Sequence, residues 1–251
     1  MNLKLNKKIA LVSGSSKGIG WAIAKQLYSE GCYVILNGRD ISILKSKKAL
    51  LGRRAFYIEG DVTKSEQTSK ISKFIENSFG KLDILICNVG SGQSVLPGKE
   101  TELEWNKMFS KNLFSTSNLI NSCRYLLSKG KGSIVCISSI CGIEFLGAPL
   151  TYSASKAALN SYIKGISRIL ASENIRINAV APGNIIFKGS VWEKKMKNNP
   201  KKINSMIKKE VALMRLGKPD EIANFVLFLA SEKSSFSTGS LIVVDGGQIR
   251  S

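Results

Sequence analysis

Residues 8–20 read KIALVSGSSKGIG, a short apolar run followed by a turn that contains three glycines. The run from Ile9 to Val12 is continuously apolar, which is typical of a parallel strand covered on both faces. The stretch therefore predicts a strand, a glycine turn and an amphipathic helix, the opening unit of a parallel α/β sheet. The helix is expected to end at Gly31, and its apolar positions are Ile19, Ala22, Ile23 and Leu27.

The glycine turn has the composition of a phosphate-binding loop. Its glycines allow a tight turn, the close approach of a phosphate, and close packing of the helix on the strand. The first helical turn offers free N–H groups and the positive end of the helix dipole. Such a turn can simply reverse the direction of the backbone, but its position between a strand and a helix favours a dinucleotide site. The residues expected around the phosphates are Gly14, Ser16, Lys17, Gly18, Ile19 and Gly20.

Apolar runs and helical patterns alternate to the end of the chain. Strands separated by helices at this spacing indicate a doubly wound parallel sheet. No internal repeat, low-complexity stretch or linker interrupts the pattern, so residues 1–251 are expected to form one domain. The predicted fold class is α/β, a single-domain Rossmann-type sheet of about seven strands flanked by helices on both faces. The expected strands are 8–12, 32–37, 55–58, 82–87, 133–137, 175–180 and 241–244, and helices are expected at 19–31, 71–79, 102–127, after Tyr152, and at 219–230.

Composition excludes several classes of protein. No apolar run approaches the roughly 20 residues that span a bilayer, and the amino end, MNLKLNKK, is too polar for a secretory signal. A cytoplasmic protein without a membrane partner is therefore expected. The five cysteines include no C-x-x-C pair, which argues for reduced thiols and against a zinc site. Histidine is absent, which removes Ser-His-Asp hydrolysis and imidazole metal sites, so no metal is expected.

The formal net charge of +19 raises the possibility of nucleic-acid binding. The excess is spread along the chain, however, and no basic aromatic stripe or known binding motif accompanies it. A solvated, lysine-rich surface is the favoured interpretation, and no specific nucleic-acid partner is expected. The one local concentration of lysines is at 188–209.

The end of the second expected strand bears on the choice of dinucleotide. An acidic residue there would bind the ribose hydroxyls and repel a 2′-phosphate. This strand instead ends Asn37-Gly38-Arg39, and no carboxylate follows until Asp40. Arg39 and Lys17 would both suit a phosphate dianion, so NADPH is expected over NADH. Asp61 and Val62 follow the third strand, where they could meet the adenine.

The stretch YSASK at 152–156 offers proton-transfer chemistry. Positions i and i+4 share one face of a helix, so Tyr152 and Lys156 can face the same space. A cation about 4 Å from a phenol favours phenolate by roughly three pK units at an effective dielectric of about 20. Tyr152 so activated could give a proton to a carbonyl oxygen or take one from an alcohol. Alone this spacing is common and weakly specific.

Taken together, these motifs resemble the short-chain dehydrogenase/reductase family, in particular its 3-oxoacyl reductases, over nearly the whole chain. Their agreement in order and spacing is far more specific than any one of them. The matching residues are Gly14, Gly18 and Gly20, Asp61 and Val62, Asn88 and Gly90 in a loosened Asn-Asn-Ala-Gly turn, Asn112, Ser139 at thirteen residues before Tyr152, Tyr152 with Lys156, and Pro182 with Gly183.

The resemblance implies roles for these residues. Ser139, rather than Ser138, would polarise the substrate carbonyl, and Tyr152 would donate the proton. Lys156 would lower the pKa of Tyr152 and hold the nicotinamide ribose, and Asn112 would fix a water in a proton relay. Pro182 and Gly183 would lie beside the nicotinamide. Ser139 could instead merely end a strand, and Asn112 could mark a helix kink.

One departure concerns the nicotinamide carboxamide. Many family members have a threonine a few residues after Pro-Gly, whereas this chain has Phe187. Nicotinamide contacts are therefore expected partly from backbone or from Ile185. The following segment, about 184–214, would be the substrate-binding loop and its helices, with Trp192, Met196, Met206 and Met214 for apolar contact. Its lysines suggest an acidic substrate or simply a solvated lid.

The sequence thus predicts an NADP(H)-dependent oxidoreductase that reduces a ketone or 3-oxo group by reversible hydride transfer. The substrate would be a small-molecule or thioester carbonyl, possibly acidic. A non-catalytic dinucleotide-binding scaffold or sensor of the same fold is the alternative, and nucleic-acid binding is a third. Against docking of a carrier protein, Glu173 stands where ketoacyl-carrier reductases often have a basic residue. The resemblance also implies a homotetramer or homodimer.

Overall fold

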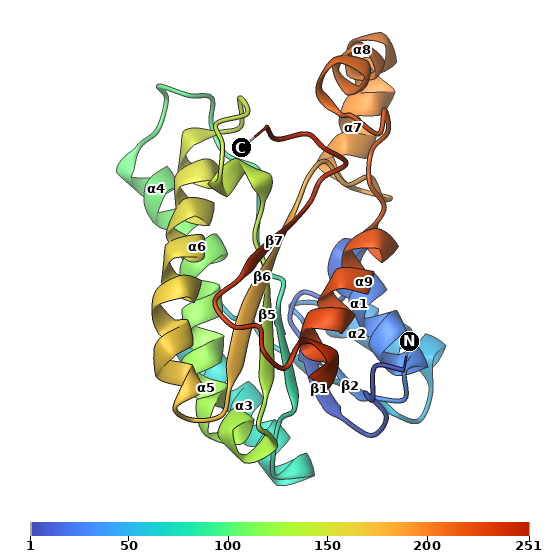
Figure 1. The fold of residues 1–251 in the computed structure, drawn as a ribbon, viewed down its shortest axis with the longest axis vertical. Helices are drawn as coiled ribbons and strands as arrows, with labels where there is room; N and C mark the ends of the chain where they lie inside the picture. The colour runs from blue at the N-terminus through green and yellow to red at the C-terminus, as the bar shows by residue number, and fades with distance from the viewer. Residues whose placement is uncertain (1, 251) are drawn as a thin grey trace.

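The computed structural model describes residues 2–250, and within them the sheet has seven parallel strands (Figure 1). The strand order is β3-β2-β1-β4-β5-β6-β7, so the order reverses between β1 and β4. The predicted doubly wound α/β sheet is confirmed, and each expected strand lies within two residues of its observed bounds. These are β1 (Ile9–Val12), β2 (Tyr33–Gly38), β3 (Ala55–Glu59), β4 (Ile84–Cys87), β5 (Ser133–Ile137), β6 (Arg176–Pro182) and β7 (Leu241–Val244).

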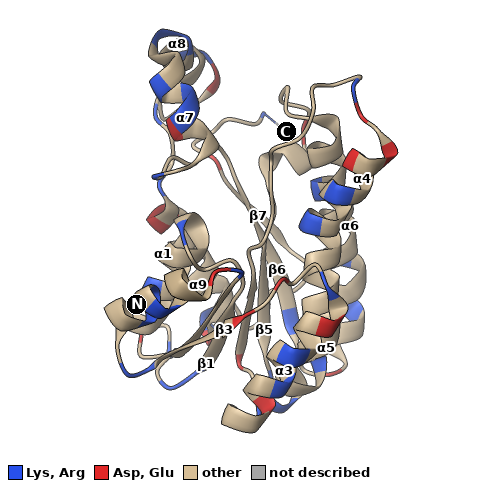
Figure 2. Ribbon diagram, turned by 180° about the vertical axis from the view of Figure 1, so that it is seen from behind, with Lys and Arg blue, Asp and Glu red and all other residues tan. Residues whose placement is uncertain are grey.

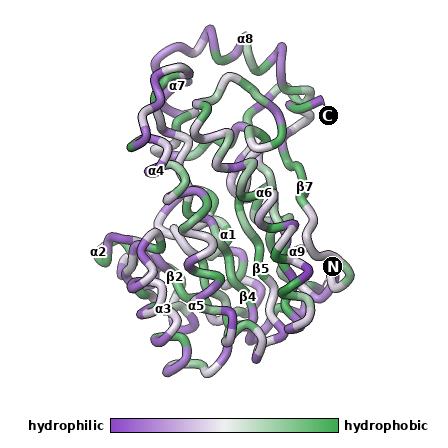
Figure 3. The backbone as a smooth tube through the Cα atoms, turned by 90° about the vertical axis from the view of Figure 1, so that its left-hand side faces the viewer, coloured by the Kyte–Doolittle hydropathy of each residue, from purple (hydrophilic) through white to green (hydrophobic). Residues whose placement is uncertain are grey.

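Helices cover both faces of the sheet (Figure 1). One layer consists of α1 (Gly18–Ser29), α2 (Ile41–Leu51) and α9 (Pro219–Ala230), and the other of α3 (Ser65–Phe79), α5 (Ser115–Gly130) and α6 (Leu150–Ala171). The strands alternate between the layers: Ala10 and Val12 face α1 and α9, whereas Ile9 and Leu11 face α3, α5 and α6. Because both faces are buried, the central strands read as continuous apolar runs, visible as green tube in Figure 3.

The helical segment expected at 102–127 is divided into three parts. It consists of α4 (Glu102–Phe109), a π-helical turn η1 (Ser110–Phe114) and α5. The π turn inserts an extra residue into the helical ladder, and such turns often occur at functional sites. Here it contains Asn112, which is fully buried. The sequence did not reveal α2, or the short 3-10 turns η2 (Ile140–Gly142) and η3 (Glu232–Ser234).

Beyond the carboxyl ends of the strands, α7 (Val191–Asn198) and α8 (Pro200–Glu210) project as a lid (Figure 1). Most of its lysines are exposed and appear blue in Figure 2. The lid has its own small core of Ile203, Ile207, Val211 and Leu216, against which Ile186, Trp192, Met196 and Met206 pack. Trp192, Met196 and Met206 therefore contribute to the stability of the lid itself, and their contact with substrate stays a prediction. None of the helices in the described part of the chain is long and apolar enough to cross a membrane.

Candidate active site

The candidate site lies between β1 and β4, where the strand order reverses. In open α/β sheets, ligands bind at this point of the carboxyl edge, because the loops that leave the two strands run in opposite directions. Asn88, directly after β4, joins the two loops: its N–H donates to Ser13 Oγ at 2.9 Å, and its Nδ2 donates to the carbonyls of Ser13 and Gly14 at 3.0 and 3.1 Å. A Cβ at Gly20 would lie 2.5 Å from Asn88 Nδ2, so glycine is required there. Asn88 and the glycine turn, which were predicted separately to bind the cofactor, are thus in direct contact.

The glycine turn leaves donors free for an anion. Gly14 and Gly18 have φ values of +61° and +58°, which favour glycine. Helix α1 begins at Gly18 with no side-chain cap on its first N–H groups, and its first turn contains no acidic residue. Uncapped N–H groups at a helix amino terminus bind phosphate well. The turn therefore fits the pyrophosphate of a dinucleotide.

At the adenosine end, Arg39 and Asp61 lie close enough to interact. Partial burial alone would raise the pKa of Asp61, but hydrogen bonds from the N–H and hydroxyl of Thr63 lower it, and Arg39 lowers it further. The side chain of Asp40 accepts from the N–H groups of Ser42 and Ile43 at 2.9 and 3.1 Å and so caps α2. The nearest carboxylate after β2 is therefore already engaged, while Arg39 and Lys17 are both exposed.

The two serines after β5 have different partners. Ser138 Oγ donates to Asn160 Oδ1 at 2.5 Å, and Asn160 Nδ2 donates to the Gly142 carbonyl, so Ser138 holds the η2 turn on α6. Ser139 Oγ accepts from the Cys141 N–H at 3.1 Å and lies next to the phenol of Tyr152. The geometry thus supports the choice of Ser139 as the residue that faces a substrate.

Asn112 is tied to both the β4 loop and α6. Its Oδ1 accepts from the Ser91 N–H at 2.8 Å, while its Nδ2 donates to the Ser91 carbonyl and to Ser155 Oγ at 3.1 and 3.0 Å. Gly90 lies beside it, since a Cβ there would be 2.9 Å from Asn112 Oδ1 and 3.2 Å from Lys156 Nζ. Asn112, Gly90 and Lys156 therefore form one cluster. The role of Ser155 in holding Asn112 was not foreseen from the sequence.

Burial shifts the pKa values of both Tyr152 and Lys156. Burial raises the pKa of Tyr152 to about 12, although a hydrogen bond with Ser139 acts in the opposite direction. Burial lowers the pKa of Lys156 to about 8, and its Nζ donates to the Ile137 carbonyl at 2.7 Å. Burial is thus the largest influence on the pKa of Tyr152 in this structure, and the role of Lys156 in lowering that pKa stays a prediction.

The segment after β6 places Ile185 largely in the core, and its predicted nicotinamide contact stays a prediction. Pro182 ends β6 at the carboxyl edge, and Gly183 packs so closely on Asp245 that a Cβ would be 2.8 Å from it. The Ile185 side chain is 7% exposed and belongs to the core cluster with Ile222.

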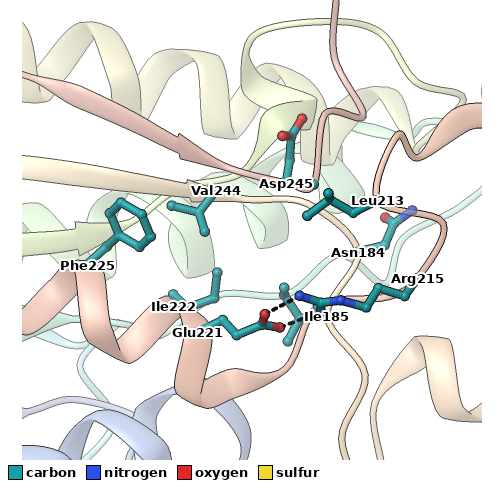
Figure 4. A pocket seen from close by; sticks show the side chains of 11 residues that line it. Asn184, Ile185, Leu213, Arg215, Glu221, Ile222, Phe225, Val244 and Asp245 are labelled. Carbon is teal, nitrogen blue, oxygen red and sulfur yellow. Dashed lines mark hydrogen bonds and ion pairs between the residues drawn. The ribbon is translucent and has the colours of Figure 1, made fainter.

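Ile185 also borders a cavity of about 220 Å³ between α9 and the end of β7 (Figure 4). The Arg215–Glu221 ion pair crosses one side of it, with contacts of 2.5 and 2.9 Å. The residues that line it do not include Asn112, Ser139, Tyr152 or Lys156. This cavity is therefore separate from the candidate active site.

Phe187 lies against the glycine turn. A Cβ built on Gly18 would fall 2.5–3.0 Å from three atoms of the Phe187 ring. The ring also borders a hollow of about 330 Å³ over α1 that Lys17, Trp21 and Lys47 line. The residue at the family's threonine position is thus an apolar anchor for the start of the lid.

The fold and site together define a dinucleotide-dependent oxidoreductase, with a phosphate turn at the switch point and a Ser, Tyr and Lys cluster beside it. Residues 14–248 match the family described as Enoyl-(Acyl carrier protein) reductase. The 3-oxoacyl-(acyl-carrier-protein) reductase FabG of Aquifex aeolicus is 35% identical over 253 residues, which covers 98% of this chain and 99% of that protein. The chain belongs to the short-chain dehydrogenase/reductase family and is similar to its 3-oxoacyl reductases.

Solved structures agree with this assignment. L-sorbose reductase from Gluconobacter frateurii, complexed with NADPH and L-sorbose, has a TM-score of 0.93 and 28% identity, with complete coverage of both chains. A 7α-hydroxysteroid dehydrogenase complexed with NADH and 7-oxo glycochenodeoxycholic acid has a TM-score of 0.89 and 28% identity, covering 100% of this chain and 97% of its own. The two relatives hold different nicotinamide cofactors, so membership of the family does not select between them.

Proposed function

We propose that the protein is a cytoplasmic, NADPH-dependent carbonyl reductase that converts a ketone or 3-oxo group to an alcohol. The observation that carries the proposal is the convergence of Ser139, Tyr152, Lys156 and Asn112 beside an uncapped phosphate turn. NADPH, when bound, would supply the hydride. The phosphate turn from Gly14 to Gly20 would hold its pyrophosphate, and Lys17 and Arg39 its 2′-phosphate.

The chain's own residues would perform the proton transfer. Ser139 Oγ would donate a hydrogen bond to the substrate carbonyl oxygen and polarise it. Tyr152, whose pKa of about 12 keeps it protonated at neutral pH, would give its proton to the same oxygen as the alkoxide develops. Lys156, with a pKa near 8, could pass a proton at little cost, and the cluster with Asn112 would orient it. A protonated phenol acts as a donor, which favours the reductive direction.

The substrate class is proposed as a 3-oxoacyl thioester or another ketone with an acidic group. The similarity to 3-oxoacyl reductases supports the thioester. The lid supports the acidic group: Lys195 on α7 lies near enough to Cys141, two residues after Ser139, to lower the pKa of that thiol against the larger effect of burial, which raises it. The Glu173 side chain forms an ion pair with Arg124, so the position that is often basic in carrier-protein reductases is neutralised here.

A homotetramer is proposed on the resemblance, and exposed apolar side chains support it. On the α4–α6 side these include Leu103, Phe114, Tyr125 and Ile169, and beside β7 they include Phe225, Phe228 and Val243. Light scattering on the purified protein tests this assembly. A monomer at micromolar concentration contradicts it.

Cofactor binding tests the proposal most directly. We expect NADPH to bind at least tenfold more tightly than NADH in a fluorescence titration. Arg39→Ala should remove most of that difference, whereas Arg53→Ala, at an exposed position after α2, should keep it. Equal binding of the two nucleotides by the unaltered protein contradicts the proposed preference. A panel of ketones and thioesters, followed by loss of NADPH absorbance and repeated with Tyr152→Phe, separates a reductase from a non-catalytic scaffold.

A further inference from the structure

The loop that follows β4 runs beside the ring of Tyr152. Residues 88–94 form neither helix nor strand. A Cβ added to Gly92 would lie 3.7–3.8 Å from three Tyr152 ring atoms, so the backbone of Gly92 faces the ring with room for one methyl group between them. The position of this loop therefore affects how far water can reach the phenol, and whatever holds the loop also affects the surroundings of the phenol.

Two sets of hydrogen bonds fix the loop to α6, one on each side of Tyr152 in the sequence. The first runs from Ser91 through Asn112 to Ser155, and belongs to the cluster described above. The second is separate from that cluster. Ser94 Oγ lies 2.7 Å from Thr151 Oγ1 and donates to Glu104 Oε2 at 3.2 Å. It thus joins the loop to the residue before Tyr152 and to α4.

The second set is well placed to hold the loop closed. Thr151 is fully buried, and its hydroxyl has Ser94 as its hydrogen-bond partner. If the loop moved away, that buried hydroxyl would lose the bond, which is unfavourable. Glu104 is fixed in turn by Lys107 at 2.9 Å, and it lies in the first turn of α4, where a carboxylate is favoured. Each residue of this hydrogen-bond network therefore has a defined position.

We propose that Glu104, Ser94 and Thr151 are positioning residues that hold the loop 88–94 beside Tyr152, and that they thereby limit the access of water to its phenol. The donor role of Tyr152 rests on the proposed function. The holding of the loop does not. None of these three residues belongs to the predicted catalytic or cofactor-binding set, and they act through the loop.

The network has a consequence for pH dependence. Burial holds the pKa of Tyr152 near 12, above the ordinary value of 10.0. A loosened loop admits water, so the pKa should fall towards 10, and reductase activity, which needs the protonated phenol, should be lost from a lower pH. The other titratable or charged groups on the elements around the phenol are Lys156 on α6, Cys141 in η2, Glu144 after it, Glu104 and Lys107 on α4, Lys111 in η1 and Lys195 on α7.

Thr151→Val tests the proposal, since valine keeps the shape of threonine and removes the hydroxyl. Hydrogen–deuterium exchange of the peptide that contains residues 88–94 should accelerate about fivefold, the effect of one neutral hydrogen bond. The high-pH limb of kcat/KM for ketone reduction should move down by about one pH unit. Thr151→Ser, which keeps the hydroxyl, should restore both values, and Glu104→Gln should give a smaller change in the same direction.

The outcomes are distinguishable. Faster exchange with an unchanged pH limb would make the network merely structural and overturn the proposal. Unchanged exchange in both Thr151→Val and Ser94→Ala would overturn it as well, whether or not any carbonyl is reduced. If the unaltered protein reduces no carbonyl compound, the proposed function fails, and the exchange measurement still decides whether the network holds the loop.

Discussion

The Nζ of Lys156 donates a hydrogen bond to the carbonyl oxygen of Ile137, 2.7 Å away, at the end of β5. The side chain of Lys156 is 3% exposed, and within residues 2–250 no carboxylate forms a hydrogen bond or ion pair with it. One carbonyl dipole compensates only part of the lost hydration of an ammonium, so the charged form is disfavoured and the pKa falls from 10.5 to about 8. Burial of Lys156, which the proposed chemistry requires, therefore lowers the stability of the folded state at neutral pH.

Lys156→Met should stabilise the protein at neutral pH while it reduces activity by about 10²-fold or more. The shift in pKa corresponds to roughly 3 kcal/mol, and loss of the bond to Ile137 offsets about 1 kcal/mol, which leaves a gain of about 2 kcal/mol at pH 7. Between pH 8 and 10.5 the unfolded state binds more protons than the folded state, so the stability of the unaltered protein rises with pH there. Urea unfolding without added nucleotide should show the gain at pH 7 and its disappearance near pH 10. A variant less stable at pH 7 contradicts the argument.

Ser138 and Ser139 should differ in their effect on catalysis, although they are adjacent. Ser139→Ala removes the group expected to polarise the carbonyl and should lower kcat by about 10²–10³-fold, while the loss of an acceptor for the Cys141 N–H should cost about 1 kcal/mol of stability. Ser138→Ala leaves Asn160 Oδ1 without its donor and should cost about 1–2 kcal/mol of stability. Its kcat should stay within a few-fold of the unaltered value. The reverse pattern would exchange the two assignments.

The sequence was sufficient for the fold and for the relative placement of Tyr152 and Lys156. The strands appear as apolar runs because both faces of the sheet are buried, and Gly14 and Gly18 have the positive φ values that favour glycine. Tyr152 and Lys156 share a helix face at a spacing that needs no tertiary information. These features are local, and local features can be derived from sequence.

The environment of the reacting groups could not be derived in the same way. The sign of the Tyr152 pKa shift depends on burial in the folded protein. Segments far away in the sequence contribute to its surroundings, and Gly92, about 60 residues earlier, lies beside its ring. Thr151 and Ser94 are 57 residues apart, and no spacing rule connects them. Likewise, the side chain of Ile185 could be assigned to the core only once the position of α9 was known.

Gly90→Ala and Gly92→Ala form a second matched pair, on one loop. A Cβ at residue 90 would press on Asn112 Oδ1 at 2.9 Å and on Lys156 Nζ at 3.2 Å. Because hydrogen bonds fix Asn112 on two sides, it cannot move away freely, and overpacking should cost about 1–3 kcal/mol. At residue 92 the new methyl would meet only ordinary contacts with Tyr152. We expect Gly90→Ala to lower both stability and kcat and Gly92→Ala to preserve both. Equal effects of the two substitutions would contradict the tight cluster around Asn112.

Phe187 should govern how firmly the lid is held at its base. Its ring packs on Gly18, and its backbone closes a turn with Ser190, whose Oγ accepts from the N–H groups of Phe187 and Glu193 at 3.2 and 3.0 Å. Since this turn leads directly into α7, the lid should move away from the glycine turn when the Phe187 ring loses its contact there. Phe187→Ala should therefore increase local opening, and trypsin should cleave after the exposed Lys188 several-fold faster than in the unaltered protein. Phe236→Ala, at a side chain that is 107% exposed, is the matched control and should leave cleavage unchanged. If Phe187→Ala is cleaved no faster than this control, the ring does not anchor the lid to the glycine turn.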